Sequence, residues 1–143
     1  MTPDQLHAVI EQAKSWLRTP YHHEGAVRGA GVDCAMLLVE VYSAAGLAEW
    51  FDPRPYPQQW MLHRSEERYV EWVLKYADEV ETCEPGDICL VRYGRTLSHS
   101  AIIIEGSRVI HAYAREGFVS WGDLTQLPFA GRELHFYRMR GEA

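Results

Sequence analysis

Apolar side chains recur at helical spacing near the start of the chain. They fall every three or four positions, at Leu6, Val9, Ile10, Ala13, Trp16 and Leu17. Thr2 followed by Pro3 is typical of a helix cap and a first-turn proline. The pattern predicts a first helix that ends before Thr19-Pro20.

Two further helices follow from the same kind of pattern. The segment CAMLLVEVYSAAG, from Cys34, is apolar nearly all round, which predicts a buried helix. Asp33 stands where it can cap that helix, and Gly46 where it can end it. Segment 65–77, SEERYVEWVLKYA, predicts a third helix with Tyr69, Val70, Val73, Leu74 and Ala77 on one side. Residues 47–63, rich in proline and aromatic side chains, predict an irregular, well-packed connection between these helices.

The pattern changes to short strands after residue 86. Alternating and continuous apolar runs predict strands at 87–92, 99–104, 108–113, 117–121 and 132–138. Glycine-containing turn signals separate these runs. Helices followed by a meander of strands indicate an α+β domain with a mostly antiparallel sheet.

Length, charge and cysteine content exclude several classes of protein. The chain has 143 residues, which predicts a single domain over 1–143. Its net charge of -6 lacks the basic footprint of a nucleic-acid-binding protein. We find neither a run long enough to cross a bilayer nor a secretory signal, so we expect synthesis in the cytoplasm and no membrane partner. Three cysteines in such a chain suggest reduced thiols.

Cys34 is the first candidate for chemistry. It follows Gly31, Val32 and Asp33 and begins the predicted buried helix. A helix N-terminus lowers a thiol pKa, and its N–H groups can stabilise the oxyanion of a tetrahedral intermediate. The alternative is an ordinary buried thiol packed as a small hydrophobe.

Two histidines offer the base that such a thiol needs. His99 begins one predicted strand and His111 lies on the next. A hairpin turning around residues 105–107 would pair residue 99 directly with residue 111 on one face of the sheet. His111 would then orient His99 and fix its tautomer, as the third member of a triad does. The alternative for each is a strand histidine that bonds only locally.

Other side chains are weaker candidates. Tyr21, His22 and His23 lie in the loop before Cys34, where they either line the site or are simply packed or solvated. A metal site from Cys34, His99 and His111 is conceivable, but no spaced ligand pair accompanies it. Cys83 and Cys89 read as a loop thiol and a core thiol.

Three blocks of the sequence resemble the NlpC/P60 family of cysteine peptidases. TPY at 19–21 followed by GVDCAMLL is similar to the family's Thr-Pro-Tyr and Gly-x-Asp-Cys block. EPGDICLV at 84–91 is similar to its Pro-Gly-Asp strand. SHSAIIIEGSRVIHA at 98–112 resembles its hairpin with two histidines. The blocks occur in the family's order over roughly residues 5–113.

The resemblance implies a fold and an activity. The fold would be papain-like, with N-terminal helices packed on a mostly antiparallel sheet of about five to six strands. Cys34 would be the nucleophile, His99 the general base and acid, and His111 the orienting residue. Tyr21, Asp33, His22 and His23 would border the substrate or the oxyanion. The implied reaction is hydrolysis of amide bonds in peptidoglycan stem peptides near D-glutamate and diaminopimelate, with no metal or cofactor.

The chain also departs from the family's pattern. Ala35-Met36 follows Cys34 where many members have Ser-Gly, and the insertion after the nucleophile helix is long. These features resemble peptidases of phage and prophage tails, which implies other tail proteins as partners and action at the cell wall as part of a tail particle. Two alternatives stay open: an amidase or acyltransferase on the same fold, and a non-catalytic tail-tip or wall-binding module.

Overall fold

The structure, a computed structural model, describes residues 1–52, 64–94 and 96–141. Most of the predicted irregular connection, residues 53–63, lies outside the described residues. Helix α1 (Pro3–Ser15) begins with a capping box in which the Thr2 side chain accepts the Gln5 N–H and the Gln5 side chain accepts the Thr2 N–H. It ends before Thr19, as predicted.

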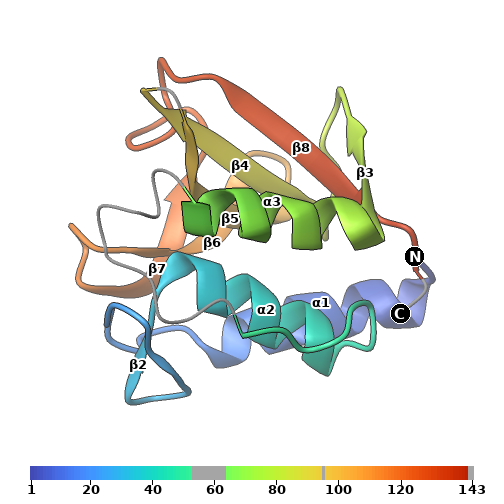
Figure 1. The fold of residues 1–143 in the computed structure, drawn as a ribbon, viewed down its shortest axis with the longest axis horizontal. Helices are drawn as coiled ribbons and strands as arrows, with labels where there is room; N and C mark the ends of the chain where they lie inside the picture. The colour runs from blue at the N-terminus through green and yellow to red at the C-terminus, as the bar shows by residue number, and fades with distance from the viewer. Residues whose placement is uncertain (53–63, 95, 142–143) are drawn as a thin grey trace.

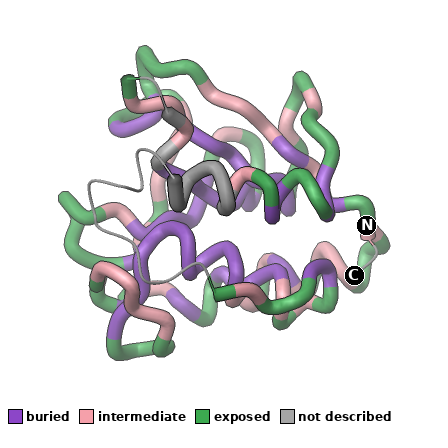
Figure 2. Tube along the Cα trace, in the orientation of Figure 1, coloured by how far each residue is buried: buried purple, intermediate pink, exposed green. Residues whose placement is uncertain are grey.

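Helix α2 (Cys34–Ala44) is the buried helix that the apolar pattern predicts. Its residues are buried over nearly the whole length (Figure 2). Asp33 is its N-cap, and Gly46 follows its end with a φ of 76°, a left-handed conformation that suits glycine. Both predicted ends of this helix are therefore confirmed.

Helix α3 (Arg64–Tyr76) is followed directly by a strand, β3 (Ala77–Val80), which the sequence analysis did not predict. The predicted helix ended at 77, and residues 78–80, DEV, were given no element. The buried side chains described on α3 are Trp72, Val73 and Tyr76. Leu74, predicted on the buried side, is 47% exposed, so that part of the prediction is wrong.

Six strands form one antiparallel sheet in the order β3-β8-β4-β5-β6-β7. The five predicted strands correspond to β4 (Ile88–Tyr93), β5 (Thr96–Glu105), β6 (Arg108–Tyr113), β7 (Phe118–Asp123) and β8 (Leu134–Met139). The bounds of β6 are as predicted, and those of the other four shift by one to three residues. A separate two-stranded sheet, β1 (Ala26–Val27) and β2 (Gly31–Val32), was not predicted.

The sheet separates two cores. The three helices lie on one face (Figure 1), where they pack against Ile102, Ile104 and Ile110. The other face carries a smaller core in which Ala101, Ile103 and Val109 pack with Phe129, from the segment between β7 and β8. Alternation over residues 99–104 of β5 therefore sends even-numbered residues toward the helices and odd-numbered residues toward Phe129.

Two polar anchors join distant parts of the chain. The buried carboxylate of Asp87 accepts N–H groups of Arg138 at 2.9 and 3.1 Å, which ties the start of β4 to β8. The Gln5 amide donates to the Gly141 carbonyl at 3.0 Å, and the two chain ends lie side by side (Figure 1). Across the described residues, no helix has the length and apolarity to traverse a bilayer.

Candidate active site

Cys34 begins α2 in a fully enclosed position. Its side chain is buried, and the Asp33 carboxylate beside it is completely buried. One Asp33 oxygen accepts the Met36 N–H at 3.0 Å, as an N-cap does, and the other accepts the Glu24 N–H at 2.8 Å. Glu24 has a φ of 64°, so Asp33 also holds a strained loop residue against the start of the helix.

Ser100, on β5, contacts both the backbone carbonyl and the thiol of Cys34. Its hydroxyl donates to the Cys34 carbonyl at 3.2 Å. Burial, followed by the negative charge of Asp33, raises the pKa of the Cys34 thiol to about 12. Hydrogen bonds from the Ser100 hydroxyl, the Ser100 N–H and the Ala35 N–H act in the opposite direction. N–H groups at the start of the helix do lower the thiol pKa, as the sequence suggested. Burial raises this pKa by more, so the thiol is protonated at rest.

His99 and His111 form a buried pair. Nε2 of His99 lies 2.9 Å from Nδ1 of His111, and their ring centres are 5.2 Å apart. Burial, followed by the neighbouring His111 ring, lowers the pKa of His99 to about 3, and burial lowers that of His111 to about 4. Both rings are therefore neutral at ordinary pH.

The register that joins them differs from the predicted one. Ile102 pairs with Ile110 and Ile103 with Val109, which is an offset of two residues from the prediction. Gly106, with a φ of 56°, and Ser107 close a two-residue turn after an irregularity between Ile103 and Glu105. Because the offset is even, residues 99 and 111 stay on the same face as diagonal neighbours, within reach of two imidazole rings.

Aromatic side chains enclose the histidine pair. Phe129 lies 5.7 Å from the His99 ring and 5.2 Å from the His111 ring, measured between ring centres. Tyr113 stacks on His111 at 5.5 Å and lies 5.4 Å from His99. This enclosure is what removes water from the two rings.

Cys34 and His99 share their neighbours. Ser100, which contacts the thiol, is the residue after His99 on β5. The ring of Tyr93 is 6.3 Å from His99, and the charge on Cys34 is one of the causes that raise the Tyr93 pKa. The structure therefore brings the predicted nucleophile and the predicted base to the same end of β5.

The loop candidates lie at different distances from this centre. Tyr21 bridges to Val32, and burial raises the pKa of its hydroxyl, with Cys34 and Asp33 adding to the effect. It therefore borders the thiol. His22 is exposed, and its Nδ1 lies 2.9 Å from the His23 carbonyl oxygen; His23 lies 3.6 Å from a Glu24 carboxylate oxygen. The backbone N–H of His22 donates to the Val32 carbonyl at 3.0 Å, which fixes this loop against the segment before Cys34.

Four residues of this centre were not singled out from the sequence. They are Ser100 on β5, Tyr93 on β4, Tyr113 on β6 and Phe129 between β7 and β8. Ser100 had a signal, since it directly follows a candidate histidine on a predicted strand. Tyr93 and Phe129 had none, because each is brought in by a turn whose geometry a single sequence does not display.

Within the described residues, no group of three His, Cys, Asp or Glu side chains is arranged to hold a metal ion. Cys89 is a core thiol and Cys83 a half-buried one, as predicted, and none of the three cysteines is in a disulfide.

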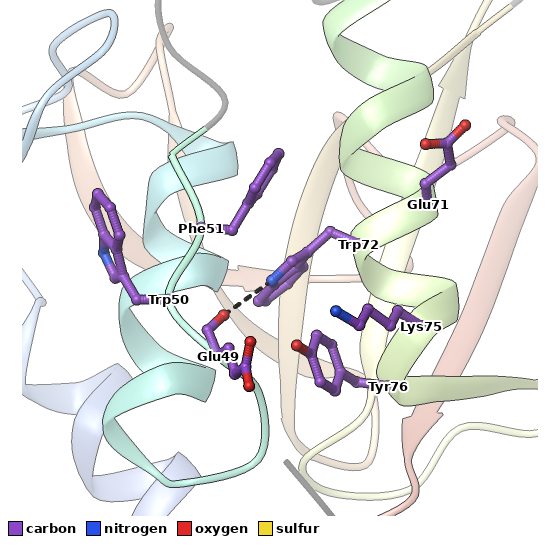
Figure 3. Close-up of a pocket in the computed structure, with 7 residues that line it drawn as sticks. All are labelled: Glu49, Trp50, Phe51, Glu71, Trp72, Lys75 and Tyr76. Atoms are coloured by element: carbon purple, nitrogen blue, oxygen red, sulfur yellow. Dashed lines mark hydrogen bonds between the residues drawn. The ribbon is translucent and has the colours of Figure 1, made fainter.

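A separate cavity of about 370 Å³ lies between the segment after α2 and helix α3 (Figure 3). Phe51, Trp72 and Tyr76 line it, with Glu49 at its edge. The Trp72 indole N–H donates to the Glu49 carbonyl at 3.1 Å and so joins the two walls. None of the predicted site residues lines this cavity.

The fold and the site define an α+β domain with a cysteine at a helix start, set against a histidine-bearing strand. The chain belongs to the NlpC/P60 family, whose model matches residues 18–138. The expected fold is thereby confirmed. A search of curated proteins returns no match.

Solved structures support the same fold. An NLP/P60-family protein similar to a lipoprotein from Staphylococcus aureus has a TM-score of 0.70 and 21% identity, over 97% of this chain and 42% of its own. The peptidoglycan hydrolase RipB from Mycobacterium tuberculosis has a TM-score of 0.63 and 18% identity, over 94% and 64%. RipD from the same organism, described as a non-catalytic domain adapted to peptidoglycan binding, has a TM-score of 0.59 and 15% identity, over 96% and 98%. The chain thus spans less than half of the S. aureus protein.

Proposed function

We propose that this chain is a cysteine peptidase that hydrolyses amide bonds in peptidoglycan stem peptides, near D-glutamate and diaminopimelate. The observation that carries the proposal is the contact of the Cys34 thiol with Ser100, next to the hydrogen-bonded pair of His99 and His111. A thiol, a base and a group that orients the base are the parts that nucleophilic acyl transfer requires. The hydrolase RipB, which shares the fold, supports the choice of substrate.

The hydrogen bond within the histidine pair suggests which nitrogen acts as the base. We assign the Nε2 proton of His99 to the bond with Nδ1 of His111, so that Nδ1 of His99 carries a lone pair. That lone pair accepts the thiol proton as Cys34 attacks the carbonyl carbon. His111 holds the tautomer and the ring, which makes it the orienting residue.

The reaction then runs in two stages. In the first, a carbon–sulfur bond forms, the carbon–nitrogen bond breaks, and Nδ1 of His99 passes its proton to the leaving amine. In the second, Nδ1 takes a proton from water and the hydroxide forms a carbon–oxygen bond with the thioester carbon. The carbon–sulfur bond breaks, the carboxylic acid leaves, and the proton returns to the sulfur. N–H groups at the start of α2, such as that of Cys34, together with Tyr21, are the proposed oxyanion donors.

The raised thiol pKa and the lowered imidazole pKa values favour a neutral resting pair over a thiolate–imidazolium pair. We expect kcat/KM to stay level between about pH 5 and pH 8, because the proposed base gains a proton only at lower pH. A pH–rate profile on a synthetic stem peptide measures this. An acid limb centred near the ordinary histidine pKa contradicts a neutral resting pair.

Single substitutions test the catalytic assignment. Cys34→Ala and His99→Ala should each reduce cleavage of purified peptidoglycan by at least about a hundredfold, and His111→Ala by less. Cys83→Ala and His135→Ala serve as controls, because they remove a cysteine and a histidine side chain that lie outside the site. Undiminished cleavage by the Cys34 or His99 variant overturns the proposal.

The setting in which the peptidase works is proposed from the sequence pattern. The long segment after α2 and the Ala35-Met36 pair favour a peptidase delivered to the wall by a phage or prophage tail. Co-purification with tail particles tests this. Peptidase absent from purified, cell-free tail particles contradicts it.

A wall-binding module without activity is the second candidate. The similarity to RipD favours it, as does the raised thiol pKa. In that case the wild-type chain sediments with insoluble peptidoglycan without releasing fragments, and Cys34→Ala sediments equally well. Release of new amino groups by the wild type alone excludes this candidate.

A further inference from the structure

A positively charged side chain lies beside the histidine pair. The guanidinium carbon of Arg132 is 3.9 Å from the centre of the Tyr93 ring, and that ring is 6.3 Å from His99. The backbone N–H of Arg132 donates to the backbone carbonyl of Phe129 at 3.1 Å, and the Phe129 ring packs on both imidazoles. The turn that carries Arg132 is therefore anchored on the same core as the proposed base.

The Arg132 side chain differs from other arginines around the sheet. Arg92 pairs with Glu133, Arg138 with Asp87, and Arg140 with Asp78. No carboxylate of the described residues pairs with Arg132, which is exposed. Glu133, the next residue, is engaged by Arg92 and by His135. Stacking on Tyr93 holds one face of the guanidinium and leaves its N–H edge for a ligand.

The positive charges of Arg132 and Arg115 both act on the Tyr93 hydroxyl. Burial is the largest cause that raises the Tyr93 pKa to about 12, and Tyr113 adds to it. The charges of Arg132 and Arg115 lower this pKa, whereas Cys34 raises it. The Tyr93 hydroxyl thus lies within electrostatic range of both guanidinium groups and of the proposed nucleophile.

We propose that Arg132 forms a carboxylate-binding subsite that selects acidic peptides for the proposed peptidase. A guanidinium fork matches the geometry of a carboxylate and binds it through two parallel hydrogen bonds. The substrate class is a stem peptide that carries a free carboxylate beside the scissile bond, as opposed to the same peptide with that group amidated. This inference rests on the proposed function for its substrate.

Two synthetic peptides that differ only in one carboxylate or carboxamide test the subsite. Wild type should cleave the acid with kcat/KM about tenfold above that for the amide, mainly through KM. Arg132→Gln should bring the acid-to-amide ratio of kcat/KM close to one. Arg132→Lys keeps the charge without the fork and should fall between the two. Arg108→Gln is the matched control, because Arg108 also stacks on an aromatic ring, 4.2 Å from the centre of Trp121.

The outcomes separate the two proposals. Equal acid-to-amide ratios in wild type and Arg132→Gln overturn the subsite while the peptidase stands. If the wild type cleaves neither peptide, the peptidase proposal fails. Calorimetric binding of both peptides to Cys34→Ala then decides the subsite: tighter binding of the acid that Arg132→Gln abolishes supports it, and equal binding overturns it.

Discussion

At the residue scale, Asp33 links backbone geometry to the chemistry of the thiol. One oxygen caps α2, the other holds the Glu24 N–H, and the charge raises the pKa of Cys34. The cap was predictable, since Asp directly before an apolar run is a common helix start. The bond to Glu24 was not, because it depends on a left-handed residue nine positions earlier.

Asp33→Asn should therefore have two effects. The amide replaces one acceptor oxygen by a donor, so a buried N–H loses its partner and the free energy of unfolding falls by about 1–3 kcal/mol. Removal of the negative charge lowers the Cys34 pKa, so alkylation of Cys34 speeds up at a given pH. Urea denaturation and pH-dependent alkylation measure these effects. Asp4→Asn, at an exposed position, is the control; a variant equal to it in both assays refutes this account.

At the element scale, the β6–β7 pair positions the orienting histidine. His111 pairs with Ser120, and Val109 pairs with Gly122. A Cβ built on Gly122 would lie 2.7 Å from Nε2 of His111 and 3.1 Å from its Cδ2. The absence of a side chain at 122 therefore makes room for the imidazole.

Gly122→Ala should displace the His111 ring and weaken its bond to His99. We expect a loss of about tenfold in kcat/KM and a shift of the His111 ring nitrogens in ¹⁵N NMR spectra. Ser120→Ala, on the same face of the same strand, should change neither. Unchanged ring signals in the Gly122 variant count against this packing argument.

The elements also show how far the sequence could predict the fold and the site. The uniform apolar pattern of residues 34–44 predicted helix α2, and the apolar runs around His99 and His111 predicted strands β5 and β6. The strand β3 was missed because it directly continues a helical pattern with no turn signal between them. The hairpin register was wrong by two residues because the predicted pairing was centred on Glu105, whereas a turn centred on Gly106 gives the observed pairing of Ile102 with Ile110. His99 and His111 still lie on the same face because an error of two residues does not change the face on which a side chain lies.

At the scale of the whole molecule, the site extends across the sheet. The thiol belongs to the core beneath the helices, and the histidine rings belong to the core around Phe129. Sequence patterns predict which residues are apolar, but not how deeply a polar group is enclosed by both layers. That is why the thiol pKa was expected to fall and instead rises.

Enclosure of the two histidines should make the fold sensitive to acid. Their folded pKa values, about 3 and about 4, lie below the unfolded value of 6.5, so the unfolded chain binds protons first as pH falls. The free energy of unfolding should decrease by about 2 kcal/mol for a single such ring between pH 7 and pH 5.

Thermal denaturation from pH 7 to pH 5 measures this loss. His99→Gln should show a shallower decline in Tm than the wild type. The raised pKa of His135, caused chiefly by Glu133 and then by Glu79, acts in the opposite direction in both proteins, so the difference between them isolates His99. Parallel curves would falsify the claim.

The order of His99 and Ser100 along β5 has a consequence for how this domain can vary. Adjacent positions on a pleated strand face opposite ways, and here Ser100 faces Cys34 while His99, the proposed base, faces Phe129. Deleting a single amino acid from that strand would exchange the two and send the imidazole into the helical layer. We therefore expect this domain to tolerate insertions and deletions in its loops and to lose activity when a residue is removed from β5.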